Sequence, residues 1–505
     1  MALVSSRLVW LALLLATVIL AAPLWLVAMP AMPDYPAHLA SFWLIGGGTS
    51  SHYAVSWAWV PNLASETMVP LLAKLLPLEL STRLFLTATV ALWVAGPALI
   101  QRALFGRIGF GPQTAALFAY NANFIWGFFN YTFAVGAGLV VLAVWIATDG
   151  RRTWAHQAGF AAVFLLLYFA HLFAFAATML AIVCFELTTT RELVRRAANF
   201  ALLCTPAAAA FLFLKPHGAD SGNLAFNLLD TAQDRIEAAI QIGFDKPATI
   251  LTALLVVLVL AGLMTRHATV HPRMRIVLAV FTVGTLLAPE WAFGGWAVHL
   301  RLPPVLGALT FASLEWRIAP RWQAAAGAAA LAFAAGCAAL LAADWRHFDA
   351  QYGEFRSHMA DIRPHARVLT VLDGDSLGWA PDQPYWHMAE LSVIDRDAFT
   401  PLMFTTAGQH VIRVRPPLGS IAAATAAQGS PPDIDELDDL AASRMEADAD
   451  YRNIYPYLRY FQCHFDQAVV IRGSGPRSRI PAMLKPAADH SFYAVYDIAH
   501  GPQCR

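Results

Sequence analysis

Apolar runs as long as a membrane span recur along this chain and constrain its fold more than any other feature. The first run, from Leu8 to Met29, has about 20 residues, enough to cross the hydrocarbon core of a bilayer. A charge at Arg7 precedes it, as in a secretory signal, but the run is too long for a signal core and predicts a retained helix. Only 13% of the 505 residues are charged and 58% are hydrophobic, whereas soluble domains are about a quarter charged. We therefore predict an integral membrane protein.

Short basic loops separate the later apolar runs. Five such groups are Arg102 and Arg107; Arg151 and Arg152; Arg191, Arg195 and Arg196; Arg266, Arg273 and Arg275; and Arg317 and Arg321. Cytoplasmic loops of membrane proteins are enriched in Lys and Arg, so all five groups should lie on the side of Arg7. Successive basic loops must then be separated by an even number of crossings.

This parity requires two long apolar stretches to fold back on themselves. Residues 113–148, about 36 in number, are too many for one span. Asn121, Asn123 and Asn130, with Gly127 between them, mark the expected break. Residues 158–187, with His171 near the midpoint, form either two short spans or one long buried helix. Further spans are expected at about 82–101, 198–214, 248–265, 276–289, 303–316 and 322–343, which makes about eleven transmembrane helices in all.

An inside N-terminus and an odd number of spans place the C-terminal part on the outer face. We expect a membrane domain over residues 1–345, with a first outer loop at 30–81, and an extracytoplasmic α/β domain over 346–505. The overall net charge is zero, yet 20 of the 34 acidic residues follow residue 345. Strands are predicted at 367–372, 409–414, 467–472 and 491–498, helix over 433–461, and a flexible loop at 416–432. No basic stripe or zinc-finger spacing suggests nucleic-acid binding.

The five cysteines divide between these parts. Cys184, Cys204 and Cys337 fall in apolar spans, where a lone thiol is most often a small core residue. Cys463 and Cys504 lie in the tail, where an oxidising compartment would allow a disulfide between them. Two unpaired buried thiols are the alternative, since geometry decides.

One carboxylate stands directly after the first span. Asp34 lies between Pro33 and Pro36, and the prolines hold the backbone in a fixed, non-helical path. The plain interpretation is a turn residue. Partial burial would raise its basicity, as a general base requires.

Three further groups carry chemistry near predicted span ends. His171 is ionisable within an apolar run and would face a cavity or, alternatively, bond to a helix carbonyl as a neutral ring. Arg301 either snorkels to the interface or, beside His299, holds a phosphate with its planar fork. Lys215 is a weaker case of the same kind.

These residues sit in motifs that resemble the GT-C superfamily of membrane glycosyltransferases. The motifs are Pro33-Asp34-Tyr35-Pro36-Ala37-His38-Leu39, Gly127-Phe128-Phe129-Asn130-Tyr131, His171-Leu172-Phe173 and His299-Leu300-Arg301-Leu302-Pro303. The resemblance extends over the membrane part, and no nucleotide-sugar motif is present, as expected for enzymes with lipid-linked donors.

The resemblance implies an inverting transfer of a sugar from a polyprenyl-phosphate donor to an acceptor hydroxyl at the outer face of a bacterial inner membrane. Asp34 would be the catalytic base, and Arg301, helped by His299 or Lys215, would bind the donor phosphate. The resemblance further gives positioning roles to Glu66, His38, Tyr35, His171 and Asn130. Some relatives carry two adjacent acids after the first helix, but here Tyr35 follows Asp34. No cofactor is therefore expected, and a divalent metal, if any, would use Asp34 and Glu66.

Two other classes of protein would explain the same features. A lipid or polysaccharide transporter would also place ionisable groups in the membrane, but paired halves are expected of it, and the sequence shows none. A catalytically silent scaffold of the same fold would use its tail to recruit partners in envelope assembly. The enzyme's partners would be the lipid-linked sugar, membrane lipids and a glycan, lipid or protein acceptor.

Overall fold

The structure is a computed structural model, which describes residues 6–188, 192–214, 224, 226–229, 231–292, 295–373, 383–419, 421, 431–435, 437, 458, 460–473, 478–500 and 504. The chain packs as two compact units. Unit 1 comprises Met1–Val27, Trp59–Ser65 and Arg83–Asp344. Unit 2 comprises Ala28–Ala58, Glu66–Thr82 and Trp345–Arg505. The first loop after α1 thus contributes most of its residues to the same unit as the C-terminal tail.

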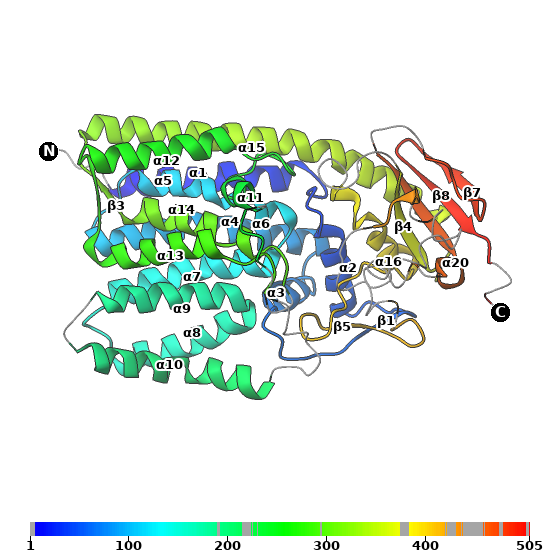
Figure 1. Cartoon of the computed structure of the whole chain (residues 1–505), viewed down its shortest axis with the longest axis horizontal. Coiled ribbons are helices and arrows are strands. Elements are labelled where there is room, and N and C mark those ends of the chain that lie inside the picture. The colour runs from blue at the N-terminus through cyan, green and yellow to red at the C-terminus, as the bar shows by residue number, and fades with distance from the viewer. Residues whose placement is uncertain are drawn as a thin grey trace. The chain divides into compact units, whose positions relative to one another are not determined.

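Unit 1 is a bundle of apolar helices (Figure 1). Among the described residues, five helices are long and apolar enough to cross a membrane, and three shorter apolar helices accompany them. The longer helices of the chain are α1 (Ser6–Leu26), α4 (Leu78–Phe105), α7 (Phe129–Ala147), α8 (Trp154–Ala170), α9 (Leu172–Leu187), α10 (Leu193–Leu214), α12 (Thr249–Met264), α13 (Arg275–Leu287), α14 (Leu302–Ser313) and α15 (Pro320–Ser357). The structure therefore fits the multi-pass membrane protein expected from the sequence, whereas the count of eleven crossings stays a prediction.

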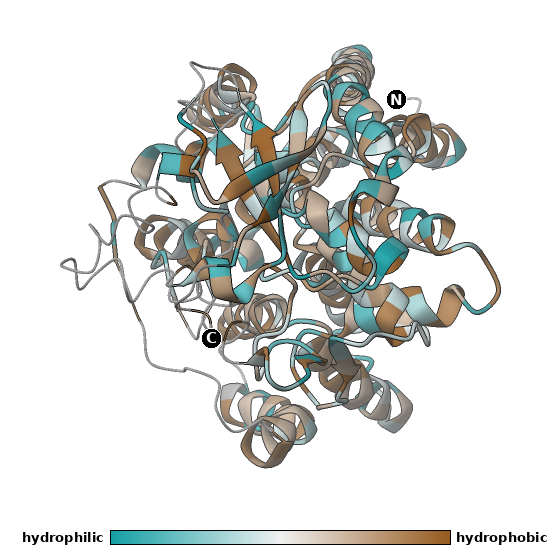
Figure 2. Ribbon diagram, turned by 90° about the vertical axis from the view of Figure 1, so that its right-hand side faces the viewer, coloured by the Kyte–Doolittle hydropathy of each residue, from teal (hydrophilic) through white to brown (hydrophobic). Residues whose placement is uncertain are grey.

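The outward faces of several helices are apolar, as lipid contact requires. Leu11 on α1, Leu212 on α10 and Val257 on α12 are all more than half exposed. Figure 2 shows brown, hydrophobic stretches along the helical ribbons. A water-soluble protein rarely exposes so many large apolar side chains together.

Both stretches expected to fold back do so. Residues 113–148 contain the short elements α5 (Gly111–Ala115), η1 (Ala116–Ala119) and α6 (Ala122–Trp126) before α7 begins. Gly127 ends α6 with a φ of 99°, a left-handed conformation that favours glycine. The second stretch breaks at His171, which ends α8 and caps α9 by accepting a hydrogen bond from the main-chain N–H of Phe173. The alternative of one long buried helix is therefore wrong.

The basic loops meet at one end of the bundle. Asp149, in the loop after α7, binds Arg196 of α10 at 2.9 Å and Arg273 of the α12–α13 loop at 2.5 Å. Arg107, after α4, binds Glu315 at 2.8 Å. Glu315 lies in β3 (Leu314–Trp316), which pairs with β2 (Ala268–Val270) of the α12–α13 loop, close to η2 (Pro272–Met274). The five loops are thus on one side, as the sequence predicts; which side of a membrane they face stays a prediction.

Unit 2 contains a four-stranded sheet in the order β4-β6-β8-β7. Its strands are β4 (Val368–Asp373), β6 (Gln467–Arg472), β7 (Leu484–Asp489) and β8 (Tyr493–Ile498). β4 and β6 are parallel, and the other neighbours are antiparallel. Its helical elements are α2 (Tyr35–Ile45), α3 (Ala64–Leu72, shared with unit 1), η4 (Met359–Asp361), η5 (Gln383–Tyr385), η6 (Met388–Glu390), α16 (Leu391–Arg396) and α20 (Phe461–His464). The strands at 367–372, 467–472 and 491–498 were predicted, but β7 was not.

The fourth predicted strand pairs elsewhere. Only Ile412–Val414 of the stretch 409–414 is a strand, β5, and it pairs with β1 (Tyr53–Val55) of the first loop. The hydroxyl of Tyr53 donates to the carbonyl of Thr400 at 2.8 Å and accepts from the N–H of Thr400 at 2.9 Å. Ala40, Leu44 and Tyr53 join Leu369, Val470 and other tail residues in one apolar core. Most of the helix predicted over 433–461 and most of the loop predicted over 416–432 lie outside the described residues.

The tail cysteines are joined. Cys463, in α20, and Cys504 form a disulfide with a Cα–Cα distance of 5.1 Å. Cys184, Cys204 and Cys337 are free thiols. The chain end is thereby linked to the segment that precedes β6.

Candidate active site

Asp34 occupies the position before the first residue of α2. Tyr35 begins the helix and Pro36 stands in its first turn, where a proline costs no hydrogen bond. A carboxylate at this position often bonds to the helix N–H groups, but that of Asp34 makes no such capping bond. Its side chain is 16% exposed. Asp34 is therefore a nearly buried acid whose oxygens are not used to start the helix.

A histidine of unit 2 lies next to Asp34, and a second acid lies next to that histidine. Nε2 of His387 lies 3.8 Å from Oδ1 of Asp34. Nδ1 of His387 faces Oε1 of Glu390, also at 3.8 Å. Glu390 is fully buried, and no hydrogen bond to its carboxylate oxygens is formed by the described residues. We call Asp34, His387 and Glu390 the acid–histidine row.

Burial shifts the titration of this row. It raises the pKa of Asp34 to about 6 by penalising the charged form, although the nearby charge of His387 acts in the opposite direction. Burial alone would lower the pKa of His387, but Glu390 and then Asp34 favour its charged form, and the pKa is raised. Asp34 thus titrates close to neutrality, in the range where a carboxylate serves best as a general base.

Aromatic rings form one wall beside the row. Phe404 contacts the ring of His387 at 5.2 Å and that of His38 at 4.9 Å, both edge to face. His38 is also stacked on Phe42, one turn further along α2. Tyr35 is buried. The row is therefore shielded from bulk water on this side, which is what raises the pKa of Asp34.

Glu66 is the remaining candidate acid of unit 2. It lies in the first turn of α3 and is buried. In the part of the chain that the structure describes, no three His, Cys, Asp or Glu side chains form a group able to hold a metal ion.

Arg301 forms a separate candidate site in unit 1. It stands between η3 (Val298–Leu300) and α14, with a relative exposure of 8%. Its guanidinium lies over the rings of Phe173, Tyr131 and Phe128, with centroid distances of 4.5, 5.2 and 5.6 Å. Nη2 donates to the carbonyl of Trp296 at 3.1 Å. The side chain of Arg301 therefore does not snorkel into solvent.

The cation of Arg301 meets no counter-charge among the described residues. No carboxylate there pairs with it, and its Nε has no hydrogen-bond partner. Burial lowers the pKa of Arg301 to about 10, so the side chain is still charged at neutral pH. A buried charge without a partner is costly, and a bound anion would remove that cost.

The ring of His171 lies beside the guanidinium of Arg301. Its Nδ1 accepts from the N–H of Phe173 at 3.2 Å, so it is not the ring bonded to a helix carbonyl that the sequence allowed. A neutral imidazole has only one N–H, which this contact places on Nε2. Nε2 lies 3.4 Å from Nη1 of Arg301. Two donors thus face each other, an arrangement that an oxyanion would bridge.

The proposed helpers of Arg301 differ from it. His299 is buried, and burial together with Arg235 lowers its pKa to about 4, so it is neutral at physiological pH and cannot act as a second cation. Its nearest acid is Asp234 of α11 (Ala232–Glu237), at 3.8 Å. Lys215 lies outside the described residues.

Asn130 is engaged by the first loop. Its Oδ1 accepts from the N–H and the hydroxyl of Ser65 at 2.6 and 2.9 Å, and its Nδ2 donates to the carbonyl of Asn62 at 3.1 Å. These bonds fasten the segment Trp59–Ser65 to α7. The nearby hydroxyl of Tyr131 donates to the carbonyl of Arg301 at 2.5 Å.

Sequence reasoning missed His387, Glu390 and Phe404. The one available signal was a histidine followed three residues later by an acid, the spacing of neighbours on one helical face. In an acidic soluble tail, such a pair is common and does not stand out.

Comparison with known proteins identifies the fold. No family model and no curated protein matches the chain. The apo structure of ArnT from Cupriavidus metallidurans matches with a TM-score of 0.52 and 12% identity, over 98% of each chain. The structure of the arabinofuranosyltransferase AftD from Mycobacteria matches with a TM-score of 0.42 and 15% identity, over 94% of this chain and 40% of that one. The ArnT likeness spans the chain from end to end, and the chain therefore has the fold of ArnT.

Proposed function

We propose that the protein is an inverting glycosyltransferase that moves a sugar from a polyprenyl-phosphate donor to an acceptor hydroxyl, with Asp34 as the general base. The observation that carries the proposal is a nearly buried carboxylate with a pKa of about 6, in a chain with the fold of a GT-C enzyme. The membrane would be the bacterial inner membrane, with Asp34 and the tail on its outer face.

The chemistry assigns one task to each candidate site. Asp34 takes the proton of the acceptor hydroxyl as that oxygen forms a bond to the anomeric carbon. The bond from this carbon to the phosphate oxygen breaks, and the electron pair leaves with the polyprenyl phosphate. Negative charge grows on the departing phosphate, so a cation already in place there stabilises the transition state most.

Arg301 fits the second task. It is charged, buried and without an acidic partner in the described chain, and the N–H of His171 points to the same place. Aromatic rings around the guanidinium restrict its motion, so little order remains to be gained on binding. Tyr35, His38, Glu66 and Asn130 would position the acceptor or the donor, either directly or through the segments they hold. A divalent metal is not part of the proposal.

The test is consumption of a lipid-linked sugar by the purified protein in proteoliposomes. A panel of polyprenyl-phosphoryl sugars is supplied with a membrane extract as the acceptor source, and released polyprenyl phosphate is measured by mass spectrometry. The protein should consume at least one donor, and Asp34→Asn, which keeps the shape and removes the basicity, should reduce the rate by at least about a hundredfold. Equal rates for the variant and the parent would refute the role of Asp34.

The same assay separates an enzyme from its rivals. A transporter would move the donor across the vesicle membrane without releasing polyprenyl phosphate, and a silent scaffold would do neither.

A further inference from the structure

A cavity lies in unit 1 at the end of the bundle that carries the basic loops. It has a volume of about 650 Å³ and is lined by the first turns of α1, the loop between α4 and α5, and the start of α15. Arg301 lies just before the first residue of α14. Glu315, which lines this cavity, lies just beyond the C-terminal end of the same helix. A 12-residue helix is about 18 Å long. The cavity is therefore distinct from the Arg301 site.

The walls of the cavity are apolar and belong to helices that face lipid. Leu8 of α1 and Ala324, Ala328 and Leu331 of α15 line it. Leu8 is 59% exposed, and the next turn of α1 presents Leu11 outward to the same degree. An acyl chain lying along α1 would find a continuous apolar path into the cavity.

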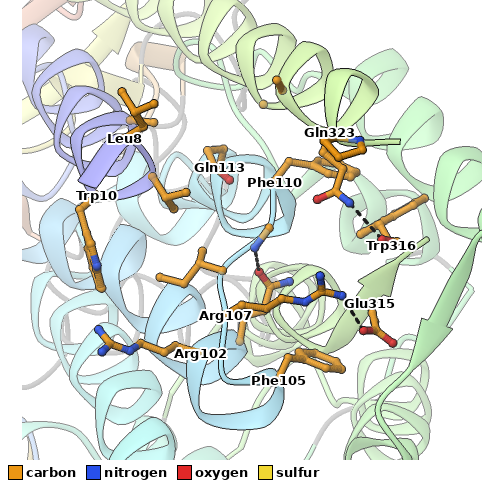
Figure 3. A pocket seen from close by; sticks show the side chains of 18 of the residues that line it. Leu8, Trp10, Arg102, Phe105, Arg107, Phe110, Gln113, Glu315, Trp316 and Gln323 are labelled. Atoms are coloured by element: carbon orange, nitrogen blue, oxygen red, sulfur yellow. Dashed lines mark hydrogen bonds and ion pairs between the residues drawn. The ribbon is translucent and has the colours of Figure 1, made fainter. Parts of the chain in front are cut away.

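The opposite end of the cavity is basic. Arg102 and Arg107 both line it (Figure 3). Arg107 is bound to Glu315 at 2.8 Å. The guanidinium of Arg102 lies 6.0 Å from the ring of Trp10, and no carboxylate of the described chain pairs with it. In Figure 3 no dashed line reaches Arg102. Within the described ranges, the charge of Arg102 is thus left without an acidic partner.

Hydrogen bonds hold this end in shape. Gln101 accepts from the N–H of Gly109 at 2.7 Å and donates to the carbonyl of Leu314 at 3.2 Å. Gln323 donates to the carbonyls of Trp316 and Ile318 at 3.3 and 3.1 Å. The loop that carries Arg107 and the strand that carries Glu315 are therefore fixed before any ligand arrives.

We propose that this cavity binds one anionic phospholipid, with the phosphate on Arg102 and part of an acyl chain between α1 and α15. The volume falls in the range of small-molecule sites, about 300–1,000 Å³, which leaves room for only part of a lipid. Among the described residues, an apolar slot lined by one cation without an acidic partner, Arg102, matches a lipid with one negative headgroup. A neutral lipid would supply no counter-charge to Arg102, and a free phosphate would make no contact with the apolar walls.

The experiment measures lipid binding to the full-length protein in detergent by native mass spectrometry. Phosphatidylglycerol and phosphatidylcholine with identical acyl chains are titrated in parallel. The parent should retain one phosphatidylglycerol with an apparent affinity about five- to tenfold above that for phosphatidylcholine, the contribution expected of one basic side chain. Arg102→Gln should abolish this preference.

Two further variants make the result specific. Arg321→Gln removes the same charge from the same end of the bundle but not from the cavity lining, and should keep the preference. Gly327→Leu should weaken binding of both lipids, because Gly327 lines the cavity and the nearest atom to an added Cβ is the Cβ of Phe110 at 3.7 Å. Melting temperatures within a few degrees of the parent show that the variants are folded.

The proposal is overturned if the parent does not discriminate between the lipids, or if Arg102→Gln keeps the preference. Equal losses in Arg102→Gln and Arg321→Gln would show general surface attraction instead of a site. Unchanged binding in Gly327→Leu would show that the acyl chain lies elsewhere.

Discussion

Nε2 of His387 lies 3.8 Å from Oδ1 of Asp34, although one residue belongs to the tail and the other to the first loop. The basicity of Asp34 is therefore set by two opposing effects from one unit: burial, which raises its pKa, and the charge of His387, which lowers it. Each effect gives a measurable expectation.

Asp34→Asn should stabilise the protein at pH 7.5 and leave it almost unchanged at pH 4. The folded state holds the proton of Asp34 more tightly than the unfolded state, because the pKa rises from 3.8 to about 6 on folding. The contribution of this group to the free energy of unfolding therefore falls as pH rises between those values and is fully unfavourable above pH 6. An amide removes that penalty, which is at most about 3 kcal/mol. Melting temperatures at both pH values measure the effect.

Asp349→Asn is the matched control. This carboxylate accepts hydrogen bonds from the N–H groups of Ala28 and Met29 at 2.9 and 2.8 Å, so the amide should lower the melting temperature at pH 7.5. A melting temperature of Asp34→Asn no higher than the parent's at pH 7.5 would contradict the burial of a destabilised charge.

The pH profile of sugar transfer should have an acidic limb near pH 6, because only the ionised form of Asp34 accepts a proton. His387→Gln removes the charge that lowers the pKa of Asp34, and should move this limb upward by about one pH unit. His410→Gln is the comparison. His410 is stacked on the same Phe404 at 5.2 Å, but burial and then Arg413 lower its pKa to about 4, so it is neutral throughout this range. If the acidic limb moves equally in His387→Gln and His410→Gln, the shift results from altered packing around Phe404 and not from the charge of His387.

Arg301→Met should raise the KM for the lipid-linked donor by about tenfold to a hundredfold, since bonds to a charged group contribute about 1.5–3 kcal/mol. Arg301→Lys keeps the charge but not the planar fork, so its donor KM should lie between those of the parent and of Arg301→Met. Initial rates over a range of donor concentrations give both values. A normal donor KM in a folded Arg301→Met variant would leave the residue with a packing role only.

Cys504→Ser should destabilise unit 2. The disulfide with Cys463 closes a loop of 41 residues, which in the chain-entropy account is worth about 4 kcal/mol. Thermal melts with and without a reducing agent test this: reduction should lower the melting temperature of the parent and leave that of the variant unchanged. If reduction does not change the melting temperature of the parent, the disulfide contributes nothing to stability.

Sequence alone predicted the elements whose signal is local. Hydrophobic length located the helices, the glycine and asparagines around residue 127 located the break before α7, and a short run of β-branched residues located β6 from end to end. The basic residues of the loops predicted that these loops share one side of the bundle. The structure adds that three arginines and two carboxylates there pair with one another.

Non-local pairing was beyond reach of the sequence. Nothing in Ile412–Val414 identifies the first loop as its partner, and nothing near His387 identifies Asp34. The role of Asp34 itself was open, because a turn residue and a general base carry the same local pattern. Only burial by distant segments distinguishes them.

The pairing of β1 with β5 sets an order of events during synthesis. Strand Tyr53–Val55 leaves the ribosome long before Ile412–Val414 exists. At ordinary rates of translation, about 5–20 residues per second, it waits roughly half a minute for its partner. Throughout that interval the first loop has an open strand edge and an uncovered Tyr53, and Asp34 has no His387. Asp34, His387 and Glu390 can therefore come together only after about the first three quarters of the chain, up to Glu390, have been translated.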